Sequence, residues 1–212
     1  MNVEELLYSA TLFDNDADKL AIYETAIKQF PNDWRGFNDA GMILFEMGKV
    51  AQAKANFDKA NTLSANNKVV KNNLGAVELK NGNVKEAEVL FGAATGAGDE
   101  VNYNKGIVAI MKGDYKAAVD YFGKCNCDNA ALANLLAGNN NEAMKKLNDN
   151  KEGSAMTSYL KAVVAARNND TNGVLSNLKV ACDKDSAMKQ LAATDIEFAK
   201  LFDNADFKSI VK

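Results

Sequence analysis

The sequence predicts an all-α fold in which hairpins of two helices repeat along the chain. A pattern of small and aromatic residues, Gly-x6-Gly-x4-Ala-x3-Phe, occurs three times, and its second glycines, Gly48, Gly82 and Gly113, are 34 and 31 residues apart. Units of this length are typical of helical repeats, in which each unit buries its apolar face against the next one. Hydrophobic residues make up 47% and charged residues 25% of the 212-residue chain, so we expect a packed core.

In order along the chain, we expect six helical hairpins followed by capping helices. Three hairpins follow the pattern clearly and three are degenerate. The repeat array is expected to cover 1–185, with hairpins at 1–33, 34–67, 68–98, 99–125, 126–152 and 153–185, and the capping helices cover 186–212.

Each clear hairpin carries a glycine in the middle of its first helix. A glycine inside a helix costs about 1 kcal/mol relative to alanine, so these positions need a packing reason. We expect the second helix to approach closely there, with a small residue opposite and a phenylalanine filling the space before the next hairpin. The glycines are Gly41, Gly75 and Gly106, the alanines are Ala53, Ala87 and Ala118, and the phenylalanines are Phe57, Phe91 and Phe122.

The second glycine of the pattern is expected to end the first helix in the left-handed conformation. Glycine and asparagine adopt that conformation at the lowest cost. Gly48, Gly82 and Gly113 occupy this place in the clear hairpins, and Asn169 occupies it in the last one.

The hairpin at 126–152 is shorter than the others. Ala118 and Ala143, which are equivalent in the pattern, are only 25 residues apart, and the segment from Cys125 to Asn129 leaves about nine residues for a first helix. We expect a shortened helix and a local change in curvature. The irregularity either shapes a binding surface or reflects a repeat that only packs.

The segment 186–212 has the pattern of a cap. Its apolar residues are spaced for one helical face, and a turn at Asp203–Asn204 would let the last apolar residues fold back over the core. The residues of the face are Met188, Leu191, Ala192, Ile196, Ala199 and Phe202, and those after the turn are Phe207, Ile210 and Val211.

The repeated residues resemble the tetratricopeptide signature. Its motif Trp-x2-Leu-Gly-x2-Tyr corresponds here to Phe37-x2-Ala40-Gly41-x2-Leu44, and the likeness covers about residues 3–182. The resemblance implies a right-handed α-α superhelix that binds proteins or peptides on its concave face. The frequent Asn-Asn and Gly-Asn pairs are also similar to tetratricopeptide segments of Bacteroidetes-type envelope-associated proteins.

In that family the first helix of each hairpin lines the concave face. The residue two before the mid-helix glycine points into it, and here those residues are Asp39, Asn73, Asn104 and Asn129. Asparagines in such a row could bind an extended peptide backbone, because each amide offers one donor and one acceptor group. The alternative is structural, since asparagine is common at this position in repeats without a ligand.

Other first-helix residues are expected on the same face. They mix apolar, aromatic and amide groups, which suits a protein-binding surface, although several could pack against neighbouring helices instead. They are Arg35, Asn38, Met42, Phe45, Asn72, Ala76, Tyr103, Ile107, Ile110, Tyr159 and Val163.

Composition argues against other classes of function. The chain has no histidine and three cysteines, Cys125, Cys127 and Cys182, which are too few for a disulfide framework and carry only a weak metal signal. We therefore expect no enzymatic activity, cofactor or metal. The net charge of −3 disfavours nucleic acid, and no apolar run is long enough to enter a membrane.

The predicted function is a protein- or peptide-binding scaffold. A structural spacer or assembly module of a larger envelope protein is the alternative. The expected compartment is the cytoplasm if the chain is complete, and the periplasm or cell envelope if it is a fragment. The oligomeric state stays open.

Overall fold

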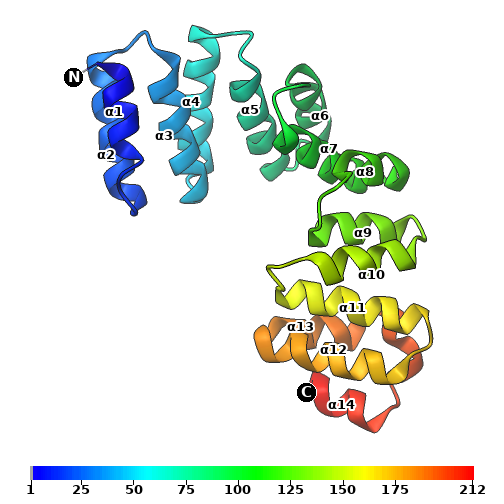
Figure 1. Cartoon of the computed structure of the whole chain (residues 1–212). Helices are drawn as coiled ribbons and strands as arrows, with labels where there is room; N and C mark the ends of the chain where they lie inside the picture. Colours follow the sequence, from blue (N-terminus) through cyan, green and yellow to red (C-terminus); the bar gives the residue numbers. More distant parts are fainter. Residues whose placement is uncertain (1) are drawn as a thin grey trace. The chain divides into compact units, whose positions relative to one another are not determined.

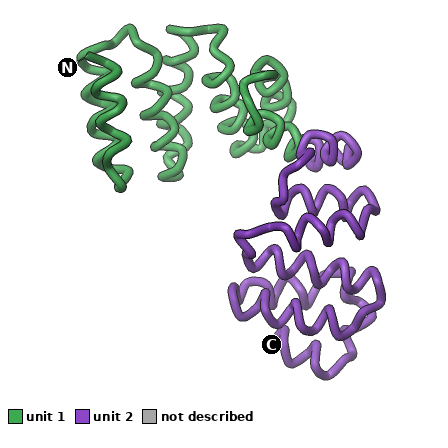
Figure 2. Tube along the Cα trace, in the orientation of Figure 1, with its two compact units in different colours: residues 1–108 green, residues 109–212 purple. Residues whose placement is uncertain are grey.

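The computed structural model describes residues 2–212, which form helices joined by short turns (Figure 1). No β-strand occurs within these residues, so the all-α prediction is confirmed. The chain divides into two compact units, residues 1–108 and 109–212 (Figure 2).

The first unit contains six helices and most of a seventh. They are α1 (Val3–Ala10), α2 (Asp16–Gln29), α3 (Trp34–Glu46), α4 (Val50–Leu63), α5 (Lys68–Lys80), α6 (Val84–Ala93) and α7 (Asp99–Lys112). Within this unit α1 packs on α2, α3 on α4 and α5 on α6, and α4 also packs on α5. Each hairpin therefore contacts the next, as expected for a repeat array.

The second unit begins with the end of α7 and contains the remaining helices. They are α8 (Tyr115–Phe122), α9 (Asp128–Leu136), α10 (Asn140–Asp149), α11 (Ala155–Arg167), α12 (Thr171–Lys184), α13 (Ala187–Thr194), the 3-10 helix η1 (Ile196–Leu201) and α14 (Ala205–Val211). The chain order confirms six helical pairs and a C-terminal cap.

The mid-helix glycines make room for an aromatic ring. A Cβ atom on Gly41 would lie 2.7 Å from the ring of Phe57, and one on Gly75 would lie 2.6 Å from the ring of Phe91. The nearest neighbour is thus the phenylalanine and not the alanine that we expected opposite. Since Phe57 also packs with Val70 of α5, it fills the space between hairpins as predicted.

The predicted left-handed helix ends are present. Gly48 has a φ of 73°. Asn169, with a φ of 56°, is the only non-glycine residue among those described that has a positive φ. Gly82 and Gly113 have similar angles, 82° and 79°. These turns let the second helix of each hairpin start at once, because the left-handed residue reverses the chain without a long loop.

The short unit has the shortened first helix that we predicted. Helix α9 contains 9 residues, and its first residue, Asp128, accepts hydrogen bonds from Ser154 Oγ and Thr157 Oγ1, both at 2.7 Å. The preceding turn contains a disulfide between Cys125 and Cys127, which the sequence analysis did not anticipate. The predicted change in curvature stays a prediction.

The cap differs from the single helical face that we predicted. Helix α13 ends at Thr194, Asp195 adopts extended backbone, and η1 follows with Phe198 fully buried. Ile196, predicted to face the core, is 84% exposed. The helix breaks because the Asp195 side chain accepts hydrogen bonds from the Glu197 backbone N–H and the Tyr159 hydroxyl.

Candidate functional site

Asparagine side chains join the first helices of successive repeats in the first unit. Asn73 Nδ2 on α5 donates to Asn38 Oδ1 on α3 at 2.9 Å, and Asn104 Nδ2 on α7 donates to Asn72 Oδ1 on α5 at 3.0 Å. Asn38 and Asn72 are each only 3% exposed. Buried amides require hydrogen-bond partners, and these two obtain them within the protein.

Asn38 and Asn72 also use their own N–H groups. Asn38 Nδ2 donates to Asp39 Oδ1 at 3.0 Å, and Asn72 Nδ2 donates to Glu100 Oε1 at 3.1 Å. Asn38 and Asn72 therefore use both their donor and their acceptor groups within the protein.

Asn73 and Asn104 keep hydrogen-bonding capacity for a ligand. Each donates one N–H to the preceding repeat, and among the described residues its Oδ1 and its second N–H have no partner. Asn73 is 9% exposed and lines a surface hollow. The bond to the neighbouring helix holds the amide in one orientation, so its acceptor is preorganised.

The hollow lies on the first unit and has a volume of about 120 Å³. Residues of α3, α4, α5 and the start of α7 line it: Met42, Phe45, Glu46, Phe57, Asn73, Ala76 and Glu100. Four of them belong to the predicted concave face, namely Met42, Phe45, Asn73 and Ala76. The structure thus brings together predicted residues from two repeats around one depression with an apolar floor.

Three lining residues were missed by the sequence analysis. Phe57 was assigned to the core alone, and the carboxylates of Glu46 and Glu100 were not considered. Glu46 lies four residues after Met42, and Glu100 lies four residues before Asn104. Because residues four apart share a helical face, extending the predicted face by one turn would have included both.

Arg35 is engaged at the start of α3. Its Nε and Nη2 donate to Asp33 Oδ1 at 3.0 Å and Oδ2 at 2.7 Å, and its Nη1 lies 3.5 Å from Glu4 Oε1. The hydrogen bonds from Arg35 hold the pKa of Asp33 below its usual range. Since Asp33 also caps α3, Arg35 stabilises this helix end in addition to carrying charge.

Asp39 is a partly buried carboxylate on the same helix. Burial raises its pKa, while the hydrogen bond from Asn38 and the charge of Arg35 act in the opposite direction. The carboxylate therefore pays a desolvation cost that a cationic ligand would reduce.

The remaining predicted residues lie outside the hollow. On α7, Tyr103 is exposed and Ile107 is half-buried, while Asn129 on α9 is half-buried in the second unit. Tyr159 on α11 is 4% exposed, its hydroxyl donates to Asp195 Oδ2 at 2.6 Å, and its ring meets Phe198 edge-on at 5.6 Å. The C-terminal cap therefore covers Tyr159.

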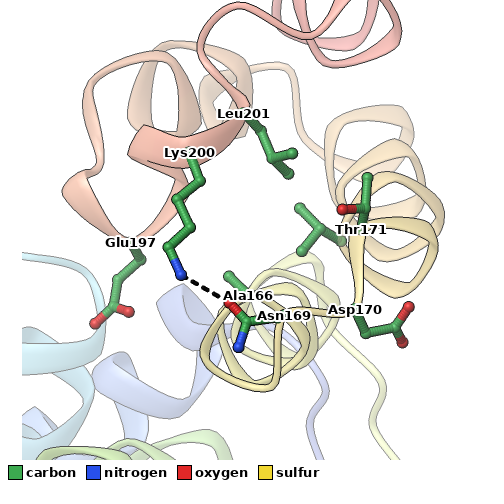
Figure 3. A pocket seen from close by; sticks show the side chains of 8 residues that line it. Ala166, Asn169, Asp170, Thr171, Glu197, Lys200 and Leu201 are labelled. Carbon is green, nitrogen blue, oxygen red and sulfur yellow. Dashed lines mark hydrogen bonds between the residues drawn. The ribbon is translucent and has the colours of Figure 1, made fainter.

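A second, smaller pocket lies in the second unit beside the turn between α11 and α12 (Figure 3). Its volume is about 70 Å³, and Lys200 Nζ donates across it to Asn169 Oδ1 at 2.7 Å. Nearby, Arg167 Nε donates to both carboxylate oxygens of Glu197 at 3.1 Å. These pairs attach η1 to the end of α11 and to the turn that follows it.

Residues 2–212 contain no group of three or more histidine, cysteine or acidic residues placed to hold a metal ion. Over the same span, none of the helices combines the length and the apolarity needed to cross a membrane.

Comparison with known proteins agrees with the repeat pattern. Residues 35–67 match the family model of a tetratricopeptide repeat. Comparison with curated protein sequences finds no significant match.

Solved structures with a similar fold include a chain of the APC/C hetero-tetramer Cut9–Hcn1, at 14% identity and a TM-score of 0.78 over 96% of this chain. This chain spans 42% of that one. PilW, a type IV pilus biogenesis factor, is similar at 16% identity and a TM-score of 0.73, with 94% of this chain and 97% of PilW covered. YrrB, described as a tetratricopeptide protein with an unusual peptide-binding site, is similar at 21% identity and a TM-score of 0.57, with coverages of 77% and 92%.

At these identities the structures inform on fold alone. The match at 35–67 covers the α3–α4 hairpin, and the similar structures cover nearly the whole array. This chain therefore contains a tetratricopeptide repeat and has the fold of tetratricopeptide-repeat proteins.

Proposed function

We propose that this chain is a scaffold that binds an extended peptide segment of another protein along the first helices of its first unit. The tetratricopeptide fold is typical of protein-interaction scaffolds, and YrrB, one of the similar structures, is described as having a peptide-binding site. The observation that carries the proposal is the pair of half-used amides at Asn73 and Asn104.

The geometry of these amides suits a peptide backbone. Each presents one acceptor and one donor group, which matches the N–H and C=O of one peptide unit without regard to side chain. The positions come from successive repeats, so they are suited to an extended chain that runs past both helices. Ordered amides also lose little conformational entropy on binding, which favours affinity.

The proposal is tested with peptides selected from a random twelve-residue library on the immobilised protein. Affinities of selected peptides are then measured by fluorescence anisotropy for the unmodified protein and for a variant with Asn73→Ala and Asn104→Ala. We expect a loss of roughly tenfold or more, since two hydrogen bonds of about 1 kcal/mol each are removed.

The matched control carries Asn56→Ala and Asn177→Ala. These asparagines lie on second helices, where their Nδ2 atoms donate to the carbonyls of Gln52 and Gly173. The control should bind as the unmodified protein does, and thermal melting should show that both variants are folded. Equal affinity of the Asn73/Asn104 variant and the control would reject the proposed surface.

An assembly role is the second candidate. Tyr8, Leu12 and Phe13 expose apolar surface at the end of α1, and PilW, a structure of similar fold, is named a pilus biogenesis factor. The assembly role is tested by light scattering, which compares the unmodified protein with a variant that carries Tyr8→Ser and Leu12→Ser. Concentration-dependent assembly that the variant lacks would support it, and a monomer at all concentrations would reject it.

A further inference from the structure

We propose that the hollow between α3 and α5 binds a lysine or arginine side chain of the peptide, so that the partner segment is basic. This inference rests on the proposed function, because the hollow adjoins the amide of Asn73 that would hold the peptide backbone. The amides would recognise any peptide backbone, whereas the hollow would select the side chain of the partner.

The hollow has acidic residues in its lining. Glu46 and Glu100 both line it, and within the described residues neither forms an ion pair with a lysine or arginine. Glu100 Oε1 accepts only the amide hydrogen bond from Asn72. Two uncompensated carboxylates beside one small depression attract a cation and repel an acidic segment.

The lining of the hollow also contains large apolar side chains. Phe45 and Phe57 line the hollow together with Met42, which is 42% exposed. A long basic side chain places its aliphatic stem on such a surface while its charged end reaches polar groups at the rim. An aromatic ring nearby adds attraction for the cation.

The size of the hollow limits its occupant. A volume of about 120 Å³ leaves room for the end of one long side chain. The partner therefore needs one basic residue at a defined distance from the backbone atoms that meet Asn73.

None of the described residues that line the hollow is a lysine or an arginine. Arg35, the basic residue predicted on this face, is engaged by Asp33 and Glu4. Asp39 adds a third carboxylate to the same face, where it accepts a hydrogen bond from Asn38 but forms no ion pair among the described residues. Asn73 contributes a largely buried acceptor that is not used by the protein.

The test repeats the random-peptide selection on a variant with Glu46→Gln and Glu100→Gln. Glutamine at position 100 can still accept the hydrogen bond from Asn72, so the variant should fold. We expect peptides from the unmodified protein to carry lysine or arginine at one fixed position and those from the variant to lose this preference. Replacing that basic residue by glutamine in a selected peptide should weaken its binding to the unmodified protein about tenfold and to the variant less than twofold.

The control carries Glu24→Gln and Glu86→Gln, exposed carboxylates on the second helices α2 and α6, and changes the net charge equally. It should keep the preference for a basic residue. Peptides that depend on Asn73 and Asn104 but show no basic position would overturn this inference and leave the proposed function standing. If no selected peptide depends on these two asparagines, the proposed function fails and this inference fails with it.

Discussion

At the scale of single residues, the contact between glycine and phenylalanine determines how closely the two helices of a hairpin approach. The ring of Phe91 lies directly against Gly75, where no side chain fits without displacement. Phe91 is fully buried, so the ring cannot move into solvent. The same contact occurs between Gly41 and Phe57, so these two repeats share glycine and phenylalanine for one physical reason.

Gly75→Ala should therefore destabilise the protein despite the better helix propensity of alanine. The added Cβ would lie 2.6 Å from the Phe91 ring, and overpacking of this kind typically costs about 1–3 kcal/mol. Urea unfolding followed by circular dichroism measures the change. Gly92→Ala is the matched control, because nothing lies within 4 Å of its Cβ position in α6, and it should stabilise by up to about 1 kcal/mol. If Gly75→Ala stabilised the protein as the control does, the close contact would be wrong.

The asparagines show how residues of one type divide between two tasks. Asn38 and Asn72 use both their donor and their acceptor groups within the protein, whereas Asn73 and Asn104 each donate one N–H to the preceding repeat and retain an acceptor. Asn38 and Asn72 lie beside the predicted row and have a structural role, and ligand binding by Asn73 and Asn104 is the proposal to be tested. Neighbouring positions on one helix differ by about 100°, which is enough to separate them.

At the scale of elements, Glu78 near the end of α5 connects three segments. Its Oε2 accepts from Asn83 Nδ2 at 2.7 Å in the following turn, and its Oε1 lies 3.3 Å from Lys54 Nζ on α4. The hydrogen bond from Asn83 and the contact with Lys54 lower the pKa of Glu78. This carboxylate therefore stabilises the α5–α6 turn and its packing on α4.

Glu78→Gln should lower the free energy of unfolding by about 1–2 kcal/mol at pH 7, since it removes one charge-assisted partner. A carboxylate whose pKa is lowered on folding stabilises the protein above its unfolded pKa, near 4.5, and loses that contribution as pH falls through its folded pKa. The difference between the two proteins should consequently shrink below pH 4.5. Urea titrations at pH 7, 5 and 3 measure it, and a difference that is constant with pH would contradict the ion-pair account.

The cap shows how an element can end a repeat array. Phe198 of η1 and Phe207 of α14 cover the core cluster that α11 and α12 share, and Arg167 holds η1 through Glu197. The cap needs no regular helix for this purpose, because a 3-10 turn places Phe198 where another repeat would place its own apolar residues.

At the scale of the whole molecule, stability should be local, because each hairpin contacts mainly its neighbours in sequence. Such arrays behave as chains of nearest-neighbour interactions and open from weakened units. The net charge of −3 is small, so charge affects binding through particular carboxylates more than through a general field.

Phe198→Ala should cost about 3–5 kcal/mol, as expected for a fully buried aromatic residue, and the loss should concentrate in the last hairpin. Hydrogen exchange measured by mass spectrometry should accelerate in α11 and α12 while α3 and α4 keep their rates. Phe13→Ala, at an exposed position, serves as control and should change neither region. Equal acceleration in all helices would show that the array unfolds as one cooperative body instead.

The sequence by itself determined the features that arise within one repeat. Helix positions, the left-handed turns at Gly48 and Asn169, the short α9 and the need for a cap follow from local propensities and from a pattern that repeats at a fixed interval. Helical periodicity also predicts which residues share the first-helix face.

Only the tertiary structure decided which of those residues remain available. It pairs Asn38 with Asn73, covers Tyr159 with the cap, joins Cys125 to Cys127, and sets Glu46 and Glu100 around one hollow. Each of these relations except the disulfide connects segments that are far apart in the chain, and the disulfide depends on the backbone path of one turn. Periodicity specifies the face on which a side chain lies, whereas its partners depend on how neighbouring helices pack.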